Sequence, residues 1–212
     1  MIYFTIFLTI IILVLFYKIF FSNKDAYVKS NVDNNYYIIR RGSQSNDFLV
    51  ESANILALVN KSIEKLIQHL QDKYPDYADL THSHHFYIKF LADNYSYKIL
   101  SEGNIDKRYT TYTIDKDEIK VCLRTRDSYD TPYDINLLLY VILHELAHLC
   151  NYDRNGKPII GHGKEFLGIF KFLIDEAIEI KVYKYVDYVK KPVNYCNLEL
   201  NSQISSDPQQ GA

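Results

Sequence analysis

The sequence predicts an α+β domain that follows an N-terminal transmembrane helix. Three observations lead to this prediction. Residues 2–21 form an apolar run with a single charge, residues 109–124 alternate like a β-hairpin, and three longer segments carry apolar residues at helical spacing. A chain of 212 residues has room for one such domain and a short appendage.

The N-terminal run is long enough to cross a membrane. Residues 2–21 reach the length that a helix needs to span a hydrocarbon core of about 30 Å, and Lys18 lies near one end. We expect a transmembrane anchor in residues 1–22 and a juxtamembrane linker in residues 23–46, in which "YYIIR" can form one short strand. A cleaved signal peptide fits less well, because no basic segment precedes the run and no small-residue cleavage site follows it.

The charges beside this run predict its orientation. The nearby basic residues lie at the C-terminal end of the run or after it, and none precedes it: Lys18, Lys24, Lys29, Arg40 and Arg41. The positive-inside tendency therefore predicts a single-pass membrane protein whose C-terminal domain lies in the cytosol or an equivalent interior.

The folded domain is expected in residues 47–202, with a disordered tail in residues 203–212. Its first element is an amphipathic helix that ends near Pro75. Further on, "YTTYTI" and "EIKVCLR" flank the turn "DKD" and predict a small antiparallel β-sheet. Asp134 can cap a helix over residues 135–150, which is apolar on nearly every face before its histidines and should be buried.

Overall charge and cysteine content restrict the partners and the compartment. The net charge is −2 and the pI is about 6.4, so the chain as a whole has no basic field that would hold nucleic acid. The three cysteines are widely spaced and include no CxxC pair. We expect buried or free thiols in a reducing compartment.

The segment "VILHELAHLC" predicts a metal centre on the buried helix. His144 and His148 are four residues apart, so both imidazoles can face one point on a helix. Zinc accepts such nitrogen ligands and leaves a position for water. Glu145 can take the proton of that water as a general base. A metal would also offset the desolvation cost of placing these groups in an apolar helix.

The third ligand is less directly defined by the sequence. A ligand six residues after His148 is excluded, because that position holds Arg154. Glutamates on the following helix are one alternative: Glu165, Glu176 and Glu179. His162 is the better candidate, because the glycines of "GHG" on both sides let the backbone bend close to a metal.

A second group of histidines lies in "THSHH", which holds His82, His84 and His85. A tight HxHH segment can bind metal. This one lacks a rigid frame and a partner carboxylate, so we interpret it as part of a surface loop.

Together, "HELAH" and the later "GHGKEF" resemble the WLM and SprT-like zinc metallopeptidases. Their pattern is HExxH, a short loop, and then HGxxF or HGxxW at the start of a helix. Stretches from "NYSYKILSEG" through "CLRTRD" to "PVNYCNLELNS" resemble a WLM-like group encoded by large nucleocytoplasmic DNA viruses. The resemblance covers roughly residues 47–202. It implies a zincin-like α+β fold, zinc held by His144, His148 and His162, Glu145 as general base, and hydrolysis of peptide bonds.

Two hypotheses follow. In the first, the chain is a membrane-anchored zinc endopeptidase that acts on a protein or peptide substrate and faces the cytosol or the virion interior. The alternative is a catalytically inactive zincin-fold membrane protein with a binding or structural role. Cellular relatives cleave proteins crosslinked to DNA, but the basic tail and zinc finger that would support that substrate are absent here. Four tyrosines are candidates for the side chain that stabilises the oxyanion of the transition state, and the sequence does not distinguish between them: Tyr183, Tyr185, Tyr188 and Tyr195.

Overall fold

The computed structural model describes residues 25–41, 45–79, 83–103, 111–114, 117–127, 129–153 and 155–201, together with Ile11. The helices of this part are α2 (Asn46–Lys73), α3 (Ser83–Asn94), α4 (Ile135–Cys150) and α5 (Lys164–Glu179). Short 3-10 turns cover Tyr77–Asp79 and Tyr97–Ile99. The long amphipathic helix and the apolar helix expected from the sequence correspond to α2 and α4.

Five strands form the main sheet, in the spatial order β1-β2-β3-β5-β4. They are β1 (Asp25–Lys29), β2 (Tyr36–Arg40), β3 (Leu100–Glu102), β4 (Tyr112–Ile114) and β5 (Glu118–Val121). A separate antiparallel pair is made by β6 (Val193–Tyr195) and β7 (Leu198–Leu200). The expected hairpin is present as β4 and β5, with Tyr112 opposite Lys120.

The prediction of a small antiparallel sheet is wrong. β3 pairs in parallel with β2 on one side and with β5 on the other, so the sheet is mixed. A parallel pair requires a crossover connection, and here α2 and α3 connect β2 to β3. The sequence pattern indicated only the local hairpin, because the parallel partners are far apart along the chain.

The prediction of a linker in residues 23–46 is wrong where the structure describes this segment, although the short strand expected at "YYIIR" is present as β2. β1 and β2 pair along their full length, and Tyr37 and Ile39 on β2 are almost completely buried. Asp33 accepts a hydrogen bond from the backbone of Asn35 at 3.0 Å, and Asn34 has a positive φ of 62°, which together close the turn. The segment is therefore part of the folded domain.

The predicted fold also included a transmembrane helix, which the described residues do not show. Within the described ranges, no helix is both long and apolar enough to cross a membrane. α2 has 28 residues but is amphipathic, and α4 is strongly apolar but has only 16 residues. The run at residues 2–21, on which the prediction depended, lies outside the described residues except for Ile11. The expected tail at 203–212 lies outside them as well.

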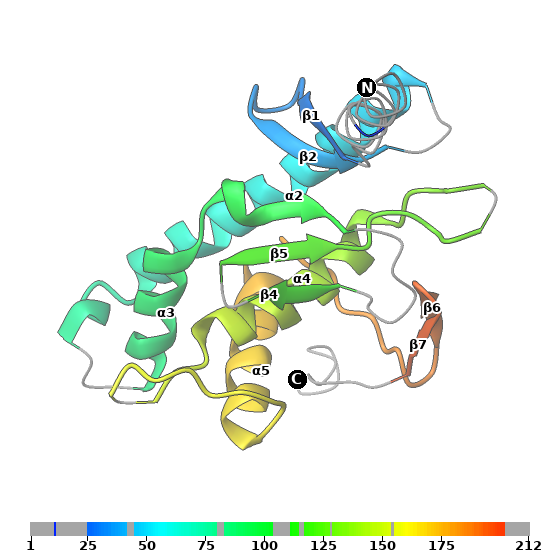
Figure 1. Cartoon of the computed structure of the whole chain (residues 1–212). Coiled ribbons are helices and arrows are strands. Elements are labelled where there is room, and N and C mark those ends of the chain that lie inside the picture. The colour runs from blue at the N-terminus through cyan, green and yellow to red at the C-terminus, as the bar shows by residue number, and fades with distance from the viewer. Residues whose placement is uncertain are drawn as a thin grey trace.

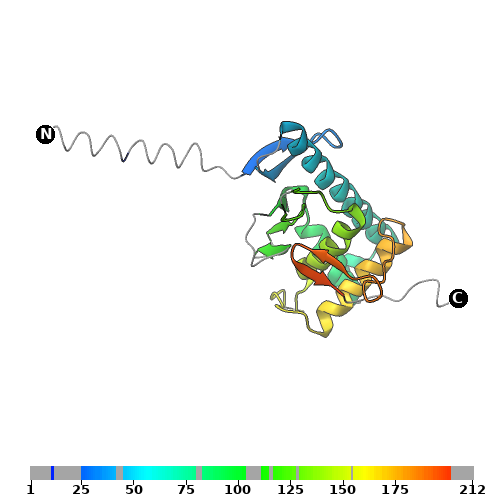
Figure 2. The same cartoon turned by 90° about the vertical axis from the view of Figure 1, so that its right-hand side faces the viewer.

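The helices cover the sheet and form the core with it. α2 contacts β1, β2 and β3, whereas α4 contacts β4 and β5 and packs against α3 and α5. Figures 1 and 2 show α4 between the strands and α5. Fully buried aliphatic residues of α2 and α4 join these layers, among them Leu56, Leu66, Leu138 and Leu146. This packing places α4 against the end of the sheet where β4 is the edge strand.

A disulfide between Cys122 and Cys196 attaches the β6–β7 hairpin to the end of β5. The two Cα atoms are 6.5 Å apart, and 74 residues separate the cysteines along the chain. The expectation of three thiols is therefore wrong for these two, whereas Cys150 is buried and lies outside the disulfide. The spacing of the cysteines does not predict the pair, because only the tertiary fold brings the two segments together.

A buried ionic network ties the β1–β2 hairpin to the centre of the sheet. Arg124, just after β5, donates to both carboxylate oxygens of Glu102 at 2.6 and 2.7 Å and to Asp130 at 2.9 Å. Arg40 on β2 donates to Asp130 at 2.6 Å. The Arg124 side chain is completely buried, so these partners are needed to offset its desolvation.

Candidate metal centre

Helix α4 positions the first two histidines. Asp134 caps the helix by accepting hydrogen bonds from the backbone N–H groups of Asn136 and Leu137. Most of the helix is buried, which fixes its rotation about its own axis. His144 and His148 are one turn apart and both are partly exposed, so they lie on the same face of the helix.

His162 comes from the loop that joins α4 to α5. Asp153 accepts hydrogen bonds from the backbone of Asn155 and Lys157, and the N–H of Ile159 donates to the carbonyl of Asn151 at 2.9 Å. Gly161 has a φ of +92°, a conformation that other residues rarely adopt. The turn at this glycine returns the chain to α4 immediately before α5 begins.

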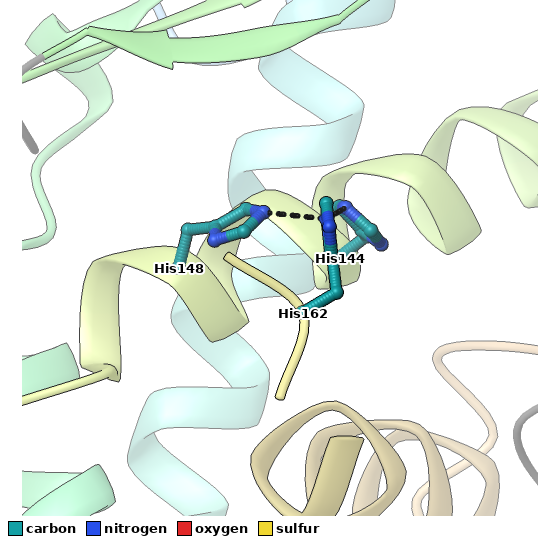
Figure 3. Close-up of side chains that lie close together, drawn as sticks. All are labelled: His144, His148 and His162. Atoms are coloured by element: carbon teal, nitrogen blue, oxygen red, sulfur yellow. Dashed lines mark hydrogen bonds between the residues drawn. The ribbon is translucent and has the colours of Figure 1, made fainter. Parts of the chain in front are cut away.

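The three imidazoles converge on one point, as Figure 3 shows. The Nε2 atom of His162 is 3.0 Å from that of His144 and 3.1 Å from that of His148. Ligands about 2.0–2.1 Å from a tetrahedral zinc ion would be separated by about 3.3 Å. The nitrogen positions therefore fit a metal of this size with minor adjustment, and three imidazoles are a suitable donor set for zinc.

Phe166 forms the support beneath the three rings. It is 1% exposed, and its ring centroid lies 4.8, 4.3 and 4.7 Å from those of His144, His148 and His162. Because Phe166 lies in the first turn of α5, it couples the start of this helix to all three histidines. The aromatic position of "GHGKEF" is thus part of the site's framework.

Glu145 lies beside the histidines but faces the sheet. Only 5% of it is exposed, and the hydroxyl of Thr113 on β4 donates to its Oε2 at 2.7 Å. Burial raises the pKa of Glu145 to about 7, against the lowering effect of the bonds from Thr113. The carboxyl group is therefore suited to exchange protons near neutral pH.

The environment also favours neutral histidine. Burial, together with the neighbouring His148 and His162, lowers the pKa of His144 to about 3. A neutral imidazole is the form that binds a metal, so this nitrogen is available as a ligand without first losing a proton.

The alternative glutamate ligands lie elsewhere. Glu165 accepts a hydrogen bond from the Tyr87 hydroxyl at 3.0 Å. Glu176 and Glu179 both accept hydrogen bonds from Lys73, at 3.0 and 2.6 Å. None of the three forms part of the group that His144, His148 and His162 make.

A second group with metal-ligand chemistry, which the sequence did not indicate, contains His69, Glu176 and Glu179. His69 Nε2 lies 2.7 Å from Glu176 Oε2. The ammonium group of Lys73 already lies between the two carboxylates, and the hydroxyl of Tyr74 donates to Glu176. A cation is thus supplied by the protein itself, and the cluster joins α2 to α5.

The histidines of "THSHH" are also separate from the centre. His84 stacks on Phe172 with ring centroids 4.5 Å apart, and Nδ1 of His85 lies 2.9 Å from Asp79. The interpretation as a surface loop is wrong for these two residues, because both lie in the first turn of α3 and His85 is buried beside a carboxylate. Both contacts are structural. His82 lies outside the described residues.

Three of the four candidate tyrosines are buried. Tyr183 and Tyr188 are each 2% exposed, with Tyr140 packed against both rings. Tyr195 is 1% exposed and donates to the carbonyl of Cys122. Tyr185 is partly exposed. The buried three serve packing, so their hydroxyl groups are poorly placed to meet a substrate.

Comparison with known proteins gives the family. The chain is 32% identical over 201 residues to "Uncharacterized protein R325" of Acanthamoeba polyphaga mimivirus, and the matched region covers 93% of each chain. It is 30% identical over 170 residues to "Uncharacterized protein 136R" of Invertebrate iridescent virus 6, covering 79% of this chain and 85% of that one. The chain belongs to the family that includes these viral proteins. No family model and no solved structure match it.

Proposed function

We propose that this chain is a zinc-dependent endopeptidase whose metal is held by His144, His148 and His162. The observation that carries the proposal is the convergence of three imidazoles beside one buried carboxylate: Nε2 of His162 lies 3.0 Å from that of His144 and 3.1 Å from that of His148. The resemblance of "HELAH" and "GHGKEF" to the WLM and SprT-like metallopeptidases supports the same reaction.

Each residue has a defined task in this proposal. Zinc, when bound, polarises the peptide carbonyl and lowers the pKa of a water to about 7. Glu145 accepts a proton as that water attacks and returns it to the leaving amine. Its pKa of about 7, which burial causes, suits both the acceptance and the return of the proton. Phe166 holds the three imidazoles in a fixed arrangement.

The substrate is a protein or peptide chain of undetermined sequence, so a generic substrate is the appropriate probe. We would incubate the full-length chain, loaded with one equivalent of zinc, with fluorescently labelled unfolded casein and identify the cleaved bonds by mass spectrometry. We expect slow cleavage that a chelator abolishes and that zinc restores.

Glu145→Gln tests the chemistry itself. The substitution removes the proton acceptor without changing the shape of the side chain, so we expect a loss of at least roughly 100-fold in rate with unchanged zinc content. Glu199→Gln, in an exposed residue of β7, is the matched control and should leave the rate unchanged. Full activity in Glu145→Gln, or zinc binding with no cleavage by the wild type, would overturn the proposal and favour a binding or structural role.

A further inference from the structure

The hydrogen bond between Thr113 and Glu145 connects the edge of the sheet to the candidate base. Among the described residues, Thr113 is the partner that the structure shows for this carboxylate. The hydroxyl lies 2.7 Å from Oε2, and the backbone N–H of Thr113 also favours the charged form of the carboxylate. Thr113 comes from β4 and Glu145 from α4, so neither residue is held there by its neighbours in sequence.

Thr113 is itself well fixed. It pairs with Ile119 of β5 in the antiparallel register, and Ile119 is completely buried. A β-branched side chain in a strand has few favourable χ1 rotamers, so the direction of the hydroxyl is largely set by the backbone. The contact between β4 and α4 then brings this hydroxyl to the carboxylate.

We propose that Thr113 is a positioning residue, which holds Oε2 of Glu145 and thereby turns Oε1 toward the point where the three histidines converge. This inference rests on the proposed function. A carboxylate rotates about its last side-chain bond, and that torsion has a broad energy profile. A hydrogen bond to one oxygen restricts the rotation and makes the two oxygens inequivalent. Oε1 is then the oxygen that accepts the proton of the attacking water, while Thr113 stays hydrogen-bonded to Oε2 and transfers no proton.

The threonine at position 113 allows a matched pair of variants. Thr113→Val keeps the shape and removes the hydroxyl, whereas Thr113→Ser keeps the hydroxyl and removes the methyl group. With the zinc-loaded full chain and labelled casein, we expect Thr113→Val to lower kcat roughly 10- to 100-fold with little change in KM. We expect Thr113→Ser to stay within about threefold of the wild type, because the general-base contribution remains. Zinc content should be equal in all three proteins.

A double-mutant cycle gives a readout that needs no activity. In metal-free protein, the urea midpoint is measured for the wild type, Thr113→Val, Glu145→Leu and the double variant. If the hydroxyl acts on the carboxylate, Thr113→Val shifts the midpoint in the wild-type background and shifts it much less in the Glu145→Leu background.

The outcomes separate the two proposals. An active wild type in which Thr113→Val retains full kcat, or in which Thr113→Ser loses as much as Thr113→Val, overturns the positioning role and leaves the peptidase standing. Additive midpoint shifts in the cycle also overturn it. A wild type that binds zinc but cleaves no bond overturns the peptidase proposal and this inference with it.

Discussion

Replacing Glu145 by glutamine should stabilise the metal-free protein, and increasingly so as the pH rises. The carboxyl group is 5% exposed, and its burial raises its pKa from the usual 4.5 to about 7. Glutamine has nearly the same shape and can still accept the hydrogen bond from Thr113, but it cannot ionise. The substitution therefore removes the cost of burying a charge while it leaves the packing in place.

The direction follows from proton binding in the two states. Between pH 4.5 and about 7 the folded protein keeps a proton on Glu145 that the unfolded chain releases, so the free energy of unfolding falls as the pH rises. This stabilisation is complete below pH 4.5 and is lost above about pH 7. Since one pKa unit corresponds to about 1.36 kcal/mol, the whole effect is about 3 kcal/mol. His144, whose pKa is lowered, has the opposite pH dependence, but it is present in both proteins and cancels in the difference.

The assay is urea unfolding of chelator-treated wild type and Glu145→Gln at pH 4.5, 6 and 8. We expect the difference in unfolding free energy to grow by about 3 kcal/mol from the lowest to the highest pH. Glu199→Gln, at an exposed position on β7, controls for the loss of one negative charge. If the wild type and Glu145→Gln respond to pH in parallel, the buried, proton-binding carboxylate described here is wrong.

Three further predictions concern the framework of the site. Arg124→Met leaves Glu102 buried without its main partner, so urea unfolding should show a free energy of unfolding lower by about 3–5 kcal/mol. The control Lys171→Met breaks an exposed ion pair and should change this free energy little. Reducing the disulfide, whose cysteines are 74 residues apart, should lower the free energy of unfolding by about 4 kcal/mol in the same assay. A variant with Ala at both cysteines is the control, and a reductant should not change its stability. Phe166→Ala should lower the free energy of unfolding by about 3–5 kcal/mol, because it removes a fully buried ring. It should also weaken zinc binding in a competition titration with a chelator, because the support under the three imidazoles is lost. Unchanged zinc affinity would contradict that role.

Local sequence patterns were sufficient to bring together the histidines of the centre. The spacing of His144 and His148 fixes their common face on a helix, and the "GHG" segment predicts a loop that returns near them. The structure places all three Nε2 atoms within hydrogen-bond distance of a neighbour. These features depend on a helix and an adjacent loop, which the sequence encodes within about twenty residues of each other.

Contacts between distant segments were not predictable in the same way. The bond between Thr113 and Glu145 depends on the register of β4 and on how β4 packs against α4, neither of which has a sequence signature. The disulfide between Cys122 and Cys196 depends on the position of the β6–β7 hairpin. Arg124 belongs to "CLRTRD", one of the stretches that carry the resemblance, but the sequence alone does not show that its side chain ends in a buried network with Glu102.

The sheet illustrates the same limit. The β4–β5 hairpin follows from alternating residues around a short turn, whereas the parallel pairing of β3 with β2 and β5 is set by the crossover connections. "YYIIR" predicts the strand β2, but the sequence does not predict its pairing with β1, because β1 is short and mixes polar with apolar residues. The burial of the β1–β2 hairpin depends on α2, which follows it in the chain and packs against it.

The metal content of the full chain tests the central claim most directly. The protein is purified without added metal, and zinc is quantified by mass spectrometry in the wild type and in His162→Ala, with His84→Ala as a control for the loss of a histidine outside the centre. We predict about one zinc per chain in the wild type and in His84→Ala, and a loss or clear weakening in His162→Ala. Folded protein that binds no zinc in any of the three forms would contradict the account, and α4 would then be a buried helix that happens to carry two histidines.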